Sequence, residues 1–204
     1  MARPANPELR NEILRAAAFI VEDCGPDCVT MRQVAERIGY SPTTIYLYFR
    51  DKSALLRASV HAAFEELTQA CDAAAVGPRA LDELRQRSRA YVVWGIMHPG
   101  HYRLMFEYSE ELQFSDEDFE TMRQSLSWQN GVVQAAVVAG ELPANCDVSG
   151  VARAVWAALH GATSLAVSRR LSEGLEAAGG PAIVETATDT ADRLLNSLLE
   201  ATTA

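Results

Sequence analysis

Hydrophobic side chains recur every three or four residues along most of the chain, with polar side chains between them. Near the start, Leu9, Ile13, Ala17 and Ile20 fall on one face at this spacing, which is the period of an amphipathic helix. Alternating β-branched runs are missing, whereas alanine, leucine, glutamate and arginine, which favour helices, dominate. The pattern therefore predicts an all-α protein.

Proline, glycine and capping residues divide this pattern into about nine predicted helices. Proline fits the first turn of a helix, and glycine takes the left-handed conformation that ends one. The predicted helices cover residues 7–23, 31–38, 42–48, 52–74, 78–97, 102–108, 115–138, 148–172 and 181–201.

The most informative segment runs from Val29 to Leu56. Thr30 is a favoured N-cap for a helix that Gly39 ends, and Ser41 followed by Pro42 starts the next helix a few residues later. Two helices joined by so short a turn cross steeply, so the second projects from the surface. This segment predicts a helix-turn-helix.

The second helix of this motif is polar on one side. Ile45 and Phe49, four residues apart, are expected to anchor it inward. Hydroxyl groups bond to phosphates and to base edges in the major groove of DNA, and cations favour a phosphate. The candidates for these contacts are Thr43, Thr44, Tyr46 and Tyr48 on the outward face, with Arg32 and Lys52 on the neighbouring helices.

The segment resembles the signature of the TetR family over about a quarter of the chain. That signature combines a threonine before the first helix, a glycine turn, a Tyr-x-Tyr-Phe stretch and a lysine before two leucines. The matching positions are Thr30, Gly39, Tyr46-Leu47-Tyr48-Phe49, Lys52 and Leu55-Leu56.

This resemblance implies a DNA-binding domain in residues 1–50 and a helical ligand-binding and dimerisation domain in residues 51–204. The third helix would enter the major groove, and Thr30 and Ser41 would meet phosphates. One of Tyr46 and Tyr48 can instead be a partly buried helix residue. The implied function is a transcriptional regulator, namely a repressor that a small hydrophobic ligand releases from a palindromic operator. A transcriptional activator of the same fold and a helical protein-interaction adaptor are the alternatives.

Aromatic and methionine side chains in the second domain are candidates for a ligand pocket, because such side chains line apolar pockets. Trp156 and His160 share a helix face, and the Trp156 to Gly161 stretch resembles one TetR subgroup, with Gly161 expected to allow close helix approach. For each candidate, a place in the core is the alternative interpretation. The candidates are Trp94, Met97, Tyr102, Met105, Phe106, Trp128, Trp156 and His160.

The last two helices are predicted to form a homodimer interface, because each has a broad apolar face. The first face consists of Val151, Ala154, Val155, Ala158, Leu159, Ala162 and Leu165, and the second of Leu194, Leu195, Leu198 and Leu199. Two such pairs would make a four-helix bundle. The dimer would place two reading helices on a palindromic site.

Charge divides the chain unevenly. Of 18 basic and 27 acidic side chains, residues 1–57 hold eight and seven, which leaves ten basic and twenty acidic in the remainder. An acidic second part repels DNA and leaves only the N-terminal part able to contact it.

The sequence contains few of the motifs that are typical of enzymes, metal-binding proteins or membrane proteins. We expect no enzyme and no cofactor, because no nucleophile elbow, phosphate loop or dinucleotide fingerprint occurs. We expect no metal site, since Cys24, Cys28, Cys71 and Cys146 match no zinc spacing and the acidic run from 110 to 120 resembles a solvated loop. The cysteines are expected to be small apolar filler, with a redox role for Cys24 and Cys28 as the alternative. No membrane-spanning or signal segment is visible, so we expect a cytoplasmic protein.

Overall fold

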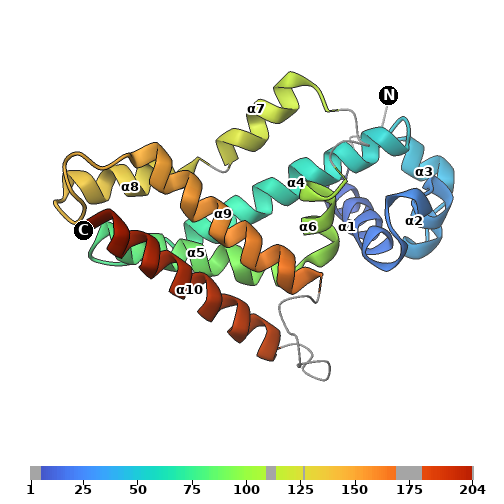
Figure 1. Ribbon diagram of the computed structural model, residues 1–204. Coiled ribbons are helices and arrows are strands. Elements are labelled where there is room, and N and C mark those ends of the chain that lie inside the picture. The colour runs from blue at the N-terminus through green and yellow to red at the C-terminus, as the bar shows by residue number, and fades with distance from the viewer. Residues whose placement is uncertain (1–5, 109–113, 126, 169–180, 204) are drawn as a thin grey trace. The chain divides into compact units, whose positions relative to one another are not determined.

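The computed structural model describes residues 6–108, 114–125, 127–168 and 181–203, and every regular element among them is a helix (Figure 1). The all-α prediction is confirmed. None of the described helices is long and apolar enough to span a membrane. In chain order the elements are α1 (Pro7–Cys24), η1 (Pro26–Cys28), α2 (Met31–Ile38), α3 (Pro42–Tyr46), α4 (Lys52–Ala73), α5 (Ala80–Met97), α6 (Pro99–Phe106), α7 (Asp116–Ser125), α8 (Trp128–Val138), α9 (Val148–Val167) and α10 (Pro181–Thr203).

The chain forms two compact units. Unit 1 holds residues 1–65 and 98–122, and unit 2 holds residues 66–97 and 123–204. Unit 1 is larger than the predicted DNA-binding domain of residues 1–50, because α6 packs against α1. The division into a DNA-binding and a ligand-binding domain describes function, and it stays a prediction.

Unit 1 is built around α1. Ile13, Ala17 and Val21 of this helix are completely buried, and α2 and α6 pack against it. Gly100 of α6 faces the backbone of Ala18, where any Cβ would collide with the carbonyl oxygen. The missing side chain therefore permits the close approach of α6 to α1.

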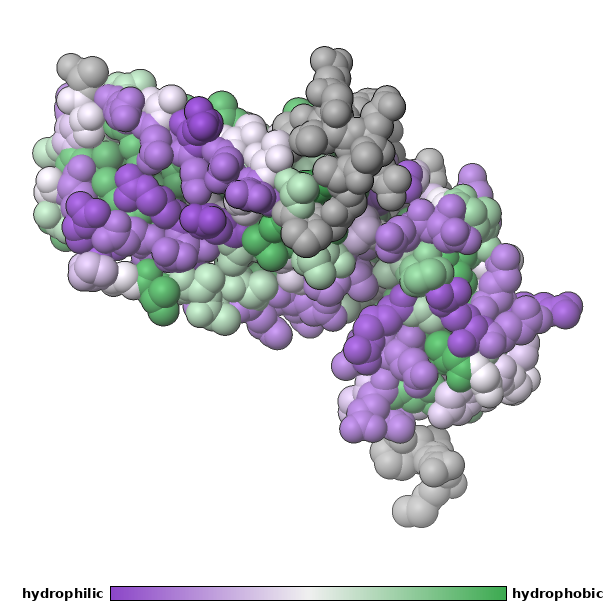
Figure 2. Space-filling model, turned by 90° about the horizontal axis from the view of Figure 1, so that it is seen from below, coloured by the Kyte–Doolittle hydropathy of each residue, from purple (hydrophilic) through white to green (hydrophobic). Residues whose placement is uncertain are grey.

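The main helices of unit 2 are α5, α8, α9 and α10, with α10 beside α9 and α5 (Figure 1), and the end of α4 also belongs to this unit. Leu84, Tyr91, Val133, Leu159 and Leu195 fill its core. The face shown in Figure 2 carries many hydrophilic residues, with hydrophobic residues in smaller patches among them. This distribution is the one expected when the apolar stripe of each helix faces inward.

Several predicted boundaries were wrong. The segment predicted as one helix over 115–138 forms two helices, α7 and α8. Between them the hydroxyl of Ser127 donates to the carbonyl oxygen of Gln124 (2.7 Å). Such a contact competes with the backbone hydrogen bonds of a continuous helix. Pro99 and Gly100, predicted as a break, lie in the first turn of α6, which proline tolerates. The acidic positions from Asp116 onward belong to α7 rather than to a loop, and residues 110 and 111 lie outside the described residues.

Candidate nucleic-acid interface and ligand cavity

The helix-turn-helix is set by two capping contacts and one glycine. The hydroxyl of Thr30 accepts from the amide of Gln33 (3.1 Å) at the start of α2. Gly39 ends α2 in the left-handed conformation, with φ of 73°. The hydroxyl of Ser41 accepts from the amide of Thr44 (3.2 Å) and starts α3. Because these contacts satisfy the amides of the first turns, local sequence determines where each helix begins.

One side of α3 is buried and the other is exposed. Ile45 is completely buried, and Phe49, just after the helix, also lies in the core. On the opposite side Thr43 is exposed, Tyr46 is 54% exposed and Leu47 is 78% exposed. A surface that combines hydroxyl and apolar groups suits the base edges and thymine methyl groups of the major groove.

Tyr48 has a structural contact inside unit 1. Its hydroxyl accepts from the backbone amide of Asn6 (3.0 Å), which ties the start of α1 to the residues after α3. Tyr48 is half-buried, whereas Tyr46 is exposed. Of the two tyrosines, Tyr46 is therefore the one that presents most of its surface outward.

The two predicted cations both contact other groups of the chain. Arg32 pairs with Glu36 on the surface of α2, with 2.7 Å between Nε and Oε1. The ammonium group of Lys52 donates to the carbonyl oxygen of Asp27 (3.2 Å). Exposed ion pairs contribute little free energy, so a phosphate can replace Glu36 as the partner of Arg32.

Sequence reasoning missed two exposed side chains beside these candidates. Leu47 directly follows Tyr46, and Tyr40 lies in the turn between Gly39 and Ser41 with a large exposed fraction. Both are large and apolar in part, and their place within the motif is the signal that points to them.

α6 carries a buried histidine against α1. His101 is 9% exposed, and its ring lies 5.9 Å from the ring of His98. Burial, helped by the charges of His98 and Arg15, lowers the pKa of His101 to about 4. This imidazole is therefore neutral at pH 7.

The predicted ligand-binding residues are divided between the units. Tyr102, Met105 and Phe106 belong to unit 1. Tyr102 and Met105 are buried, and Phe106 packs on Tyr102 and on Phe64 of α4, with ring centroids 4.8 and 5.7 Å apart. These three side chains form core contacts of unit 1. This agrees with a place in the core, the alternative to a ligand-binding role.

The remaining candidates belong to unit 2. Trp94 is buried, whereas Met97 is 64% exposed. The guanidinium of Arg87 lies over the ring of Trp128, 5.6 Å from its centroid. Trp156 stacks on His160 with 5.5 Å between the ring centroids. A Cβ on Gly161 would meet no atom within 4 Å, so this chain makes no close approach at Gly161 within its described residues.

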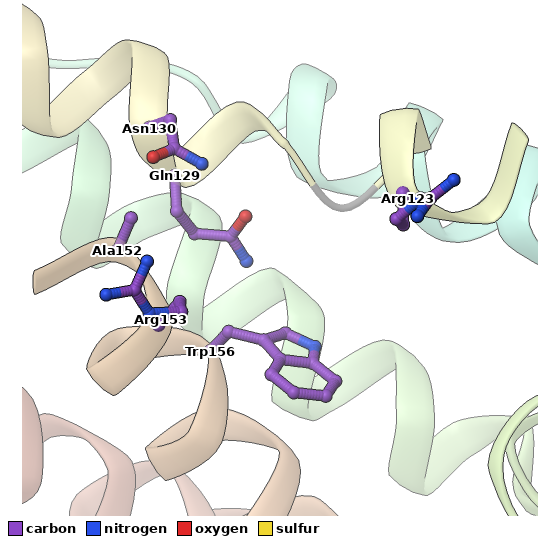
Figure 3. Close-up of a pocket in the computed structure, with 6 residues that line it drawn as sticks. All are labelled: Arg123, Gln129, Asn130, Ala152, Arg153 and Trp156. Carbon is purple, nitrogen blue, oxygen red and sulfur yellow. The ribbon is translucent and has the colours of Figure 1, made fainter. Parts of the chain in front are cut away.

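A cavity of about 210 Å³ in unit 2 is lined by residues of α8, α9 and the end of α7 (Figure 3). Of the eight predicted ligand-binding residues, only Trp156 lines it. The sequence missed the other lining residues, because polar side chains on a helix resemble any solvated face. The lining residues are Arg123, Gln129, Asn130, Ala152, Arg153 and Trp156.

The cysteines are free thiols in different surroundings. Cys71 is buried, as expected for filler, whereas Cys24 is exposed. Cys28 donates to the carbonyl oxygen of Cys24 (3.1 Å), and the pKa of Cys24 is raised to about 11, mainly by a hydrogen bond with Cys28. A protonated thiol is a poor nucleophile.

The described residues bring no three metal-ligating side chains together.

Family models match both parts of the chain. One for the tetracyclin repressor-like C-terminal domain matches residues 84–198, more than half of the chain, and one for bacterial regulatory proteins of the tetR family matches residues 13–59. The fold and these two matches define a DNA-binding transcriptional regulator of the helix-turn-helix class. The chain belongs to the TetR family.

Known proteins resemble the chain in sequence over a short segment and in structure over nearly its full length. The tetracycline repressor protein class A from transposon 1721 of Escherichia coli is 39% identical over 56 residues, 28% of this chain and 26% of the repressor. The chain therefore covers about a quarter of that curated relative. A protein of unknown function from Rhodococcus sp. RHA1 has 26% identity and a TM-score of 0.75, with 98% of this chain and 100% of that chain covered.

FadR from Bacillus subtilis, solved in complex with stearoyl-CoA, has 15% identity and a TM-score of 0.70. The comparison covers 91% of this chain and 97% of that chain. At this level of identity the likeness shows the fold alone.

Proposed function

We propose that the protein is a homodimeric repressor that binds a palindromic operator and leaves it when a small ligand binds. The observation that carries the proposal is the outer face of α3, where Thr43, Tyr46 and Leu47 are exposed while Ile45 and Phe49 hold the helix in the core. A helix anchored in this way presents its side chains to the major groove.

The proposed contacts separate into two kinds. Thr43 and Tyr46 meet base edges or the sugar-phosphate backbone beside them, because their side chains face outward. Arg32 neutralises a phosphate after exchanging Glu36 for it. The other five candidates lie close to the phosphate backbone. They are Thr30, Ser41, Thr44 and Tyr48, with Lys52 as a second cation.

The proposed dimer interface lies on α9 and α10. Of the predicted faces, Val155, Leu159 and Leu195 are buried in the core of unit 2 and cannot meet a second copy. Leu165 of α9 and Leu194 of α10 are each 43% exposed. Burial of these leucines against a second copy removes apolar surface from water and forms a four-helix bundle. The dimer then carries two α3 helices, which fit half-sites about one helical turn, ~34 Å, apart.

The cavity of unit 2 supports control by a ligand. A ligand that binds one spacing of the two α3 helices better than another shifts the population toward that spacing, and the affinity for DNA changes with it. FadR from Bacillus subtilis, which was solved with stearoyl-CoA, supports an effector within the same fold.

Selection of duplexes from a random DNA pool by the purified protein tests the first part of the proposal. We expect enrichment of a palindrome that is bound more weakly as salt rises, because phosphate contacts release counterions. Failure to enrich any sequence from ligand-free protein would contradict it and favour the adaptor alternative.

A reporter gene tests the sign of regulation. With the enriched palindrome placed across a promoter, we expect expression to fall when the protein is produced. A rise in expression would identify an activator instead.

A further inference from the structure

Three buried polar atoms at the cavity of unit 2 have no hydrogen-bond partner in the described part of the chain. Two belong to the amide of Gln129 on α8, a residue that is 1% exposed, and the third is the indole Nε1 of Trp156 on α9. Buried polar groups almost always have a partner. Unpartnered atoms beside a cavity are candidates to bond to a molecule inside it, and the inference rests on the proposed function as a ligand-controlled regulator.

The hydrogen-bonding groups restrict the chemistry of that molecule. Figure 3 shows the amide of Gln129 and the indole of Trp156 facing the same space. The indole is a donor only, whereas the amide offers both a donor and an acceptor. A matching ligand presents an acceptor to Trp156 and a group such as a hydroxyl, which both donates and accepts, to Gln129.

The charges around the cavity favour an anion. Two of its six lining residues are arginines, Arg123 and Arg153, and none carries a carboxylate. Both arginines are exposed. A lining with one sign of charge attracts ligands of the other sign.

The size of the cavity favours a single ring. A dry cavity of about 150 Å³ accepts benzene, and pockets for drug-sized ligands have about 300–1,000 Å³. At about 210 Å³, this cavity accepts one aromatic ring with small substituents. The methyl group of Ala152 and the edge of the Trp156 indole provide apolar surface for such a ring.

We propose that the cavity binds a monocyclic aromatic carboxylate that carries a ring hydroxyl group. The carboxylate accepts from Trp156 Nε1, and the positive charges of Arg123 and Arg153, which also line the cavity, favour it. The hydroxyl group bonds to the amide of Gln129. This assignment names the effector class of the regulator and gives Gln129 and Trp156 the specificity-determining contacts.

Calorimetric titration of the full chain, without DNA, with 4-hydroxybenzoate tests the proposal. Benzoate lacks the hydroxyl group and phenol lacks the carboxylate, so we expect each to bind about tenfold more weakly, the change expected for one lost hydrogen bond to a buried group. Gln129→Leu and Trp156→Phe are expected to weaken 4-hydroxybenzoate by about the same factor. Gln134→Leu, an exposed glutamine on the same helix, is the matched control and should bind normally.

Thermal melting of the same variants separates ligand binding from folding. Gln129→Leu replaces an unpartnered buried amide by an apolar group, so its melting temperature should equal or exceed that of the parent chain. Equal affinity of the parent chain and Gln129→Leu for 4-hydroxybenzoate, no binding of that acid, or saturable binding of stearoyl-CoA in its place would each overturn the proposal. None of these results would affect the DNA selection, so the two proposals fail independently.

Discussion

Tyr46 shows how one side chain can be separated from the fold around it. It is about half exposed and has no part in the core. In Tyr46→Ala we expect DNA affinity to fall by about tenfold, with an unfolding free energy within about 0.5 kcal/mol of the parent value. Gel-shift titration and urea denaturation measure the two quantities, and Tyr46→Phe separates the hydroxyl from the ring. Unchanged affinity in Tyr46→Ala would remove this residue from the interface.

His101 makes the stability of unit 1 depend on pH. Its pKa is lowered from 6.5 to about 4 in the folded chain, so the unfolded chain takes up the proton first as pH falls. The contribution of His101 to the unfolding free energy should therefore decrease from about pH 6.5 to pH 4, by about 3 kcal/mol at most, and level off below that. Urea denaturation across this range should give a shallower decrease for His101→Gln. Identical pH profiles for the two proteins would contradict this reading of His101.

The sequence predicts the exposed residues of α3 better than it predicts the residues of the cavity in unit 2. Thr43 and Tyr46 follow from the motif, because a short helix between a glycine turn and a buried aromatic residue has only one outward face. Gln129 does not, because its significance comes from burial without a partner, which depends on how α8 and α9 pack. Trp156 was predicted for its aromatic character, and its unpartnered Nε1 was visible only in the structure.

At the scale of elements, the contact between α1 and α6 depends on one glycine. A Cβ on Gly100 would collide with the carbonyl oxygen of Ala18 and lie 3.0 Å from the Cβ of Glu22. Gly100→Ala should therefore destabilise the protein by about 1–3 kcal/mol through overpacking, measured by chemical denaturation. Gly131→Ala is the matched control, since a Cβ there meets no atom within 4 Å, and it should be neutral or stabilising by up to about 1 kcal/mol. Equal stabilities would show that the approach of α6 to α1 is not tight.

Most helices were predictable because capping residues and glycine act locally. Thr30, Gly39 and Ser41 set α2 and α3 as expected, and Asp51 accepts from the amide of Ala54 (2.7 Å) near the start of α4. The errors fall where local signals compete. Continuous helical periodicity through Ser127 hid the division of α7 from α8, and the Pro99-Gly100 pair that resembles a break is a helix start.

At the scale of the whole molecule, the account requires two chains to act together. Sedimentation should find a species of twice the chain mass. Leu165→Glu combined with Leu194→Glu should convert the dimer to a monomer, because each chain would then bury two carboxylates at the interface. Val138→Glu, on an 80% exposed residue of α8, should remain dimeric. A parent chain that stays monomeric at all concentrations would contradict the four-helix interface.

The distribution of charge agrees with DNA contact through the N-terminal part of the chain alone. The acidic excess lies beyond residue 57, so the rest of the chain repels DNA and disfavours non-specific contact away from α3. DNA affinity is then expected to come from a few contacts around α2 and α3.

Fluorescence anisotropy of a labelled duplex that carries the enriched palindrome tests the central claim most directly. The account predicts two chains per duplex, affinity at least about a thousandfold higher than for a scrambled duplex, and weaker binding as salt rises. Equal affinity for the palindrome and the scrambled duplex would contradict the claim that this protein reads DNA sequence through α3.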